Sequence, residues 1–125
     1  MTRYFSLLML VGGLACASAG ATGGSARNSM VITQDEIAAS HEANAYDVVR
    51  QLRPNYLRSH GQSSVNSGGS DLPSIFVDGQ FSGDVDALRN VIATTIKEIR
   101  YYSAPDAGTR FGTQYTSGVI AVTTR

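Results

Sequence analysis

The sequence predicts a small α+β domain in which short helices pack on a mixed β-sheet. Two apolar runs, 74–77 and 118–124, have the length of buried strands and are bounded by turn residues. Apolar residues recur at helical spacing in 46–52 and 85–92. Because the helical and strand patterns alternate along the chain, we expect the helices to cover a single sheet.

Residues 1–19 are typical of a signal peptide. Arg3 precedes an uncharged apolar run over residues 4–14, which is too short to span a bilayer. Cleavage after Ala19 would satisfy the small-x-small pattern, whereas the residues before Cys16 resemble a relaxed lipobox, whose cleavage would leave a lipidated cysteine at the new N-terminus. We expect lipidation of Cys16, which would anchor the protein to a membrane, and export into the bacterial envelope.

Residues 20–29 predict a flexible tether, because they are rich in glycine, alanine, serine and threonine and have no period. The remaining residues, 30–125, are enough for one domain with a modest core. The chain has ten basic and ten acidic residues, and no basic patch is evident, so nucleic-acid binding has no electrostatic basis. Its single cysteine excludes a disulfide within the chain.

The segment after the tether predicts a short strand and two helices. Residues 30–32 favour the strand, and Thr33 with Glu36 has the pattern of a capping box for a first helix. Asn44 is suited to be the N-cap of a second helix, which Pro54 ends. We expect this second helix to bury one face, formed by Tyr46, Val49 and Leu52.

The middle of the chain predicts strands around a polar loop. Residues 55–58 favour a short strand, and residues 61–70 are too polar and glycine-rich to pack, so we expect a mobile loop. Residues 74–77 favour a strand that ends at the turn signal Asp78-Gly79, and Phe81 begins the returning strand.

The last third predicts two more helices and two more strands. Residues 84–94 have apolar residues at helical spacing with acids at the start, which indicates an amphipathic α-helix. Residues 96–101 favour a strand, and Pro105 is suited to the first turn of a short helix, which Gly112 ends. A buried strand over residues 118–124 follows.

No set of residues has the pattern of a catalytic or metal site. His41 and His60 have no second histidine, cysteine or carboxylate at metal-ligand spacing, so we expect both to be solvated loop residues. The serines form no Gly-x-Ser-x-Gly elbow, and the Ser/Gly-rich segment lacks the lysine of a phosphate loop. The sequence therefore predicts a protein that is not an enzyme and carries no cofactor.

Four segments, in order, resemble the plug domain of TonB-dependent outer-membrane receptors. The resemblance covers about residues 30–125, and its most specific part is the C-terminal pattern, similar to the family's I-E-x-I, Y-G and G-V-I-x-V-T-T-(K/R). A second specific part is similar to its P-x-(I/V)-(F/Y)-(V/I)-D-G strand and turn. The matching residues are 31–37, 44–54, 73–79, and the group 96–100, 104, 110–112 and 117–125.

The resemblance implies a function in transport or as a receptor domain at the outer membrane. In that family the plug is a small domain inside a β-barrel, where it blocks the channel, presents loops to a ligand and extends a TonB box to an energy-transducing partner. This chain ends at Arg125, where the barrel would begin, and residues 20–29 lack the pattern of a TonB box. We therefore expect a stand-alone plug-like binding domain, lipid-anchored on the periplasmic face of the outer membrane or free in the periplasm.

The partner expected for such a domain is an outer-membrane β-barrel or receptor protein, or a small ligand. The alternative is that the chain is a fragment or a split half of a TonB-dependent transporter that imports a ligand. In either case we expect contacts from three polar segments, 60–70, 79–83 and 113–117, because polar loops free of packing constraints can adapt to a partner. The candidate ligand-binding residues are His60, Gln62, Asn66, Gln80, Gln114 and Tyr115.

Overall fold

The computed structural model describes residues 29–59 and 71–125. The predicted signal peptide, Cys16, nearly all of the predicted tether and the predicted loop 61–70 lie outside the described residues. None of the helices in the described ranges has both the length and the apolar composition needed to cross a bilayer.

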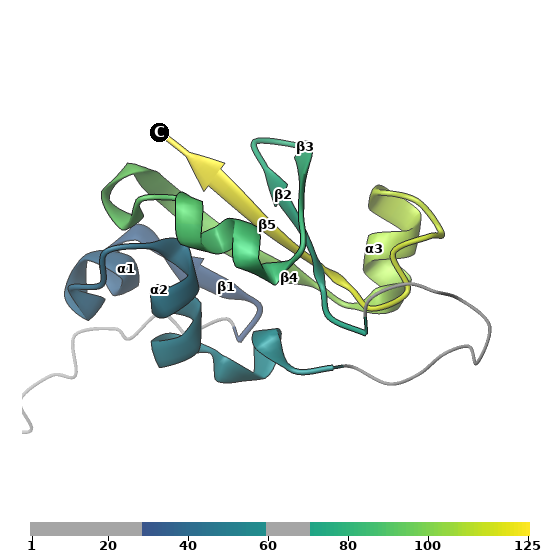
Figure 1. Cartoon of the computed structure of the whole chain (residues 1–125), viewed down its shortest axis with the longest axis horizontal. Coiled ribbons are helices and arrows are strands. Elements are labelled where there is room, and N and C mark those ends of the chain that lie inside the picture. Colours follow the sequence, from purple (N-terminus) through teal and green to yellow (C-terminus); the bar gives the residue numbers. More distant parts are fainter. Residues whose placement is uncertain (1–28, 60–70) are drawn as a thin grey trace, which may run out of the picture.

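The described residues form one mixed sheet of five strands in the order β1-β4-β5-β2-β3 (Figure 1). The central strand β5 is parallel to β2 and antiparallel to β4, and the edge strands β1 and β3 are each antiparallel to their neighbour. The predicted α+β class with a mixed sheet is confirmed. The strands are β1 (Val31–Thr33), β2 (Ser74–Val77), β3 (Gln80–Gly83), β4 (Ile96–Tyr102) and β5 (Val119–Thr124).

Short helices join these strands. Figure 1 shows α1 and α2 at one end of the sheet and α3 at the other. The described α-helices are α1 (Gln34–Ser40), α2 (Ala45–Leu52) and α3 (Ala104–Arg110). The 3-10 helices in the same ranges are η1 (Pro54–Leu57), η2 (Val85–Asn90) and η3 (Ala93–Thr95).

The predicted start of α1 is confirmed at the level of individual hydrogen bonds. The backbone N–H of Glu36 donates to the Thr33 hydroxyl at 3.4 Å, and the backbone N–H of Thr33 donates to the Glu36 carboxylate at 3.0 Å. The helix ends at His41, whose φ of 56° is left-handed. Glu36 also pairs with Arg53 at 3.1 Å, which links the start of α1 to the end of α2.

The start of α2 at Asn44 is also confirmed, since the Asn44 side chain accepts the backbone N–H of Asp47 at 3.0 Å. Its buried face is wider than predicted. Val49 is fully buried as expected, together with Ala45 and Val48, which the prediction left out, while Tyr46 and Leu52 lie partly buried at the edge of the core.

The predicted strand at 55–58 is wrong, because Pro54–Leu57 form η1. Pro54 lies in the first turn, where its fixed φ suits a helical conformation. The turn places Tyr56 in the core, where its ring stacks on Tyr101 with centroids 4.9 Å apart. The Tyr56 hydroxyl donates to the carbonyl of Ser29 at 2.6 Å, so this buried polar atom is satisfied.

The predicted α-helix at 84–94 is also wrong, because two 3-10 helices flank an extended step at 91–92. At that step the Val91 carbonyl accepts the N–H of Ala45 at 2.8 Å, and Ala43 accepts the N–H of Ala93 at 3.0 Å. These backbone groups are therefore not available to a continuous helix. The spacing of Val85, Leu88 and Val91 fits a period of three as well as an α-helix.

The two faces of the sheet differ in what covers them. Along β5, Ile120 and Val122 belong to a large core with α1, α2, η1, η2 and η3, whereas Val119 and Ala121 belong to a smaller cluster with α3. This alternation follows from the two-residue period of a strand. We call these the core face and the aromatic face; both contribute to the fold, but the core face contains most of the buried apolar residues.

Candidate functional site

The aromatic face has a cluster of rings around Phe76 in β2. The Phe76 ring lies 4.5 Å from Phe111, 5.2 Å from Tyr115 and 5.7 Å from Phe81, centroid to centroid. Tyr102 in β4 packs edge-on against Phe111 at 5.2 Å. We call these five residues the aromatic surface.

The fold brings these rings together from three parts of the chain. Phe76 and Phe81 pair directly across the β2–β3 hairpin, while Phe111 caps the C-terminal end of α3 and Tyr115 follows in the connection to β5. Gly118 ends that connection with a φ of +89°. A Cβ at this position would lie 2.8 Å from the Tyr102 carbonyl oxygen, so only glycine lets β5 pass this close to β4.

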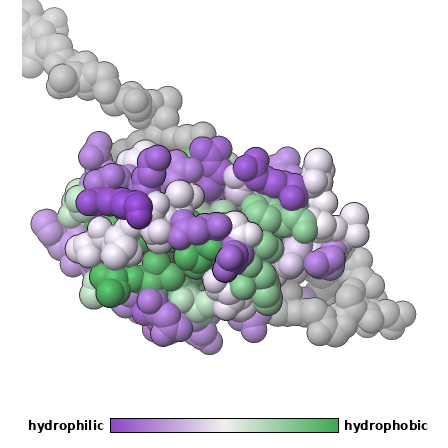
Figure 2. Space-filling view, turned by 90° about the horizontal axis from the view of Figure 1, so that it is seen from above, coloured by the Kyte–Doolittle hydropathy of each residue, from purple (hydrophilic) through white to green (hydrophobic). Residues whose placement is uncertain are grey.

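The aromatic surface is incompletely covered. Phe76 is 7% exposed, whereas the Phe81 side chain on the edge strand β3 is 58% exposed, although both rings belong to one cluster. Figure 2 colours one face of the molecule by hydropathy. Hydrophobic residues are exposed in a group on this face, between hydrophilic ones. An exposed aromatic residue beside buried ones is a typical anchor of an interface.

Two of the three polar segments predicted to bind a ligand meet at this surface. Tyr115, from segment 113–117, contacts Phe81, from segment 79–83, with ring centroids 6.2 Å apart. Gln80 and Gln114 are both exposed, and the Gln114 side chain lies over Gly112. His60, Gln62 and Asn66 lie outside the described residues.

The predicted contact segment 79–83 contains Phe81, but the individual candidate residues were chosen for their polar groups and did not include it, and Phe111 lies outside every predicted segment. The available signal was the position of each ring. Phe81 lies two residues after Gly79 of the Asp78-Gly79 turn, and Phe111 directly precedes Gly112, so each aromatic residue lies close to a turn.

The turn beside the aromatic surface is fixed by a contact with β5. Asp78 and Gly79 have φ of 50° and 83°, the positive values of a two-residue hairpin turn, as predicted. The Asp78 carboxylate accepts the backbone N–H of Thr124 at 2.8 Å and its hydroxyl at 2.7 Å. These hydrogen bonds lower the pKa of Asp78, because both favour the ionised carboxylate.

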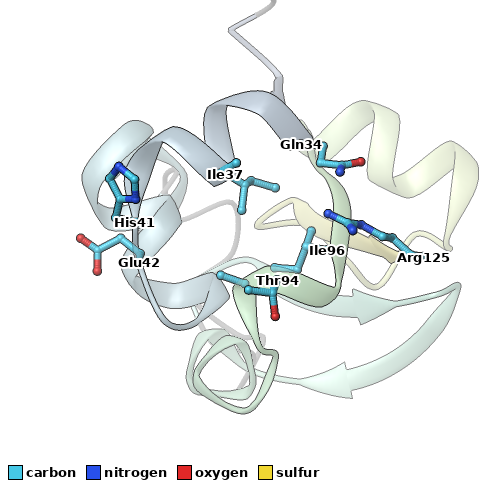
Figure 3. Close-up of a pocket in the computed structure, with 9 residues that line it drawn as sticks. Gln34, Ile37, His41, Glu42, Thr94, Ile96 and Arg125 are labelled. Atoms are coloured by element: carbon cyan, nitrogen blue, oxygen red, sulfur yellow. The ribbon is translucent and has the colours of Figure 1, made fainter.

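A pocket of about 490 Å³ lies at the opposite end of the sheet, beside α1. Its apolar lining includes Ile37, Ala93 and Ile96, and Figure 3 shows Gln34 and Arg125 on one side, with His41 and Glu42 on the other. His41 was predicted to be a solvated loop residue. It is exposed at the C-terminal end of α1, at the rim of this pocket. Within the described ranges no group of three or more histidine, cysteine, aspartate or glutamate side chains is placed to hold a metal ion.

The most strongly shifted titratable group in the described residues belongs to the core. Burial raises the pKa of Tyr56 to about 12, an effect that Arg53 opposes and Glu36 reinforces. Burial also raises the pKa of Tyr101, on which Tyr56 stacks. Both tyrosines are part of the packed core, so their titration bears on stability and not on a reaction.

Comparison with known proteins gives no relative: no family model matches this chain, and neither the curated proteins nor the solved structures contain a match. Function is therefore inferred from the residues and geometry of this chain.

Proposed function

We propose that this chain is a plug-like binding domain of the bacterial envelope, related to the plug of TonB-dependent receptors, and that it acts by binding and not by catalysis. Its partner is an outer-membrane β-barrel protein, which it contacts through the aromatic surface. Lipidation of Cys16 would hold it at the periplasmic face of the outer membrane; without lipidation it would be periplasmic.

The observation that carries this proposal is the contact between two of the plug-like motifs. Asp78 ends the motif 73–79, and Thr124 lies in the C-terminal motif 117–125, yet the Asp78 carboxylate accepts two hydrogen bonds from Thr124. The same two motifs supply β2 and β5, which pair in parallel at the centre of the sheet. The two motif segments thus form one structural unit at the centre of the sheet, which is consistent with the proposal.

The chemistry of the aromatic surface supports a protein partner. Phe81 is exposed on an edge strand and is backed by buried rings, so it can enter a pocket on a partner without first losing much side-chain freedom. The exposed amide of Gln114, next to Tyr115 in the chain, provides a polar group at the edge of this surface. A polar group beside an aromatic centre suits the interior of a β-barrel, whose lining is polar.

Site-specific cross-linking in cells tests the proposal. A photoreactive phenylalanine analogue is placed at position 81 of the full exported chain, and a matched analogue is placed at position 97, where Lys97 is exposed on β4. We expect position 81 to form a cross-link to an outer-membrane β-barrel protein, identified by mass spectrometry, and position 97 to form none. Equal cross-linking from both positions, or a cross-link from position 81 only to non-barrel proteins, would contradict the proposal.

The same experiment addresses the alternative of a split transporter. If the cross-linked barrel imports a ligand, and if deleting this chain abolishes that import, the chain is one half of a transporter. If import continues without the chain, the stand-alone binding domain is favoured. In both cases the partner surface is the one proposed here.

Mass spectrometry of the mature N-terminus tests the anchor. We expect an acylated Cys16 in the outer-membrane fraction. A mature N-terminus at Gly20 in the soluble periplasmic fraction would contradict lipidation and leave the binding proposal intact.

A further inference from the structure

The pocket beside α1 is separate from the aromatic surface and has the dimensions of a small-molecule site. Its volume of about 490 Å³ falls within the range of about 300–1,000 Å³ that ligand pockets occupy. Ile37 and Ala38 line it from α1, and Ala93 and Ile96 line it from η3 and the start of β4. Ile37, Ala93 and Ile96 are 4%, 3% and 0% exposed and form its floor, while Ala38 and Thr94 are exposed at its sides.

One end of the pocket has hydrogen-bond donors directed over it. Figure 3 shows the Arg125 guanidinium extending toward Gln34 above Ile96, while the Glu42 carboxylate at the other end is directed away from the pocket. The backbone N–H of Arg125 donates to the Thr95 carbonyl at 3.0 Å, so the base of this side chain is held at the pocket edge.

Arg125 has no acidic partner in the part of the chain that the structure describes. Other described arginines have their charge engaged within the fold, whereas no ion pair within those ranges involves Arg125. A guanidinium without a partner, next to an apolar pocket, is suited to bind an anion, and its planar fork fits a carboxylate with two hydrogen bonds. Five described arginines have such contacts: Arg50, Arg53, Arg89 and Arg100 pair with acids, and Arg110 lies over the Tyr102 ring.

We propose that this pocket binds a small monocarboxylate with an apolar tail. The Arg125 guanidinium pairs with the carboxylate, the Gln34 amide donates a further hydrogen bond, and the tail lies over the floor of the pocket, between the exposed residues Ala38 and Thr94. This site is additional to the partner surface proposed above and does not depend on it, because the pocket shares no residue with the aromatic surface.

The test uses the exported chain as purified from cells, with octanoate as the probe and octanamide as its uncharged counterpart. Binding is followed by NMR below the concentration at which octanoate forms micelles. We expect saturable shifts in the methyl signals of Ile37, Ala93 and Ile96, with octanoate bound about tenfold more tightly than octanamide because of the charged hydrogen bonds. Equal affinity for the two probes, or the absence of saturable shifts, would overturn the proposal.

Two variants separate the carboxylate contact from general apolar binding. Arg125→Gln is expected to lower octanoate affinity about tenfold and to leave octanamide affinity unchanged. The matched control Arg110→Gln removes an arginine on α3, away from the pocket, and is expected to leave both affinities unchanged. Equal losses in the two variants, or shifts centred on Phe81 and Tyr115 in place of the pocket methyls, would contradict the assignment.

Discussion

On β5, Ile120 and its neighbour Val119 are both fully buried, but they point to faces of the sheet with different surroundings. The core face is covered by α1, α2 and the 3-10 helices, and its strand residues Ile32, Ile75 and Ile99 are completely enclosed. The aromatic face is covered by α3 and the connection that follows it, and Phe81 remains more than half exposed. The core face therefore supplies most of the buried apolar residues, while the aromatic face keeps one exposed ring, Phe81, beside buried ones.

The largest expected effect comes from a pair of substitutions on opposite faces of β5. Ile120→Ala removes a fully buried side chain from the core face and is expected to lower the free energy of unfolding by about 2–5 kcal/mol. Thr123→Ala alters an exposed side chain and is expected to change the free energy of unfolding by less than about 0.5 kcal/mol. Urea denaturation measures both values. Similar losses in the two variants would contradict the difference between the faces.

Tyr56→Phe removes a buried hydroxyl from the core face and leaves the Ser29 carbonyl without this donor. We expect a loss of about 1 kcal/mol at neutral pH. The pH dependence of stability tests the burial of the Tyr56 hydroxyl more directly. Because the pKa of Tyr56 is about 12 in the folded state and about 10 when unfolded, the folded state retains the proton longer, and stability falls as the pH rises from about 10 to 12.

In Tyr56→Phe this alkaline decline should become smaller than in the natural protein, as measured by urea denaturation at a series of pH values. A decline should still be present, because burial also raises the pKa of Tyr101. An unchanged decline would mean that Tyr56 does not titrate as its buried position requires.

The Asp78-Gly79 turn lies between the centre of the sheet and the aromatic surface, and substitutions of Asp78 are expected to have smaller effects on stability. Its lowered pKa means that its hydrogen bonds to Thr124 stabilise the fold above the ordinary pKa of 3.8, and that this contribution is lost as the pH falls through the lower folded value. Asp78→Asn should weaken this acid dependence of the melting temperature and still tolerate the positive φ of the turn.

Asp78→Ala should lower the melting temperature at pH 7 more than Asp78→Asn, because alanine removes the acceptor and tolerates a positive φ poorly. Thermal unfolding followed by circular dichroism gives the comparison. Equal melting temperatures for the two variants would show that the side chain and the positive φ do not matter at this turn.

The sequence predicted the parts of the fold that depend on neighbouring residues. The Thr33–Glu36 capping box, the Asn44 cap and the Asp78-Gly79 turn each depend on side chains within a few positions, and each was predicted correctly. The two failures depend on distant partners. The buried position of Tyr56 depends on its stacking against Tyr101, and the step at 91–92 is fixed by hydrogen bonds to Ala43 and Ala45.

The same distinction applies to the candidate site. The sequence indicated Gln80 and Tyr115 because they lie in polar surface segments, but it could not indicate that Phe81 contacts Tyr115. That contact requires the β2–β3 hairpin and the connection after α3 to lie on one face of the sheet. The pocket beside α1 was also not predicted, since it is formed by residues from the beginning, middle and end of the domain.

A small effect on stability is also expected for Phe81→Ser. Its exposed ring makes an edge contact with Phe76, so we expect the free energy of unfolding to fall by less than about 1.5 kcal/mol. Urea denaturation alongside Ile120→Ala gives the value. A loss as large as that of Ile120→Ala would place Phe81 in the core and contradict its assignment to a partner surface.

We propose that the aromatic face binds a partner that the fold itself does not require. The most direct measurement is the yield of the cross-link from a photoreactive analogue at position 115, compared in cells with Phe81 and with Phe81→Ser. Because the two rings are neighbours, we predict about a tenfold loss of the cross-link to the barrel protein with the amount of folded chain unchanged. An unchanged yield would contradict the claim.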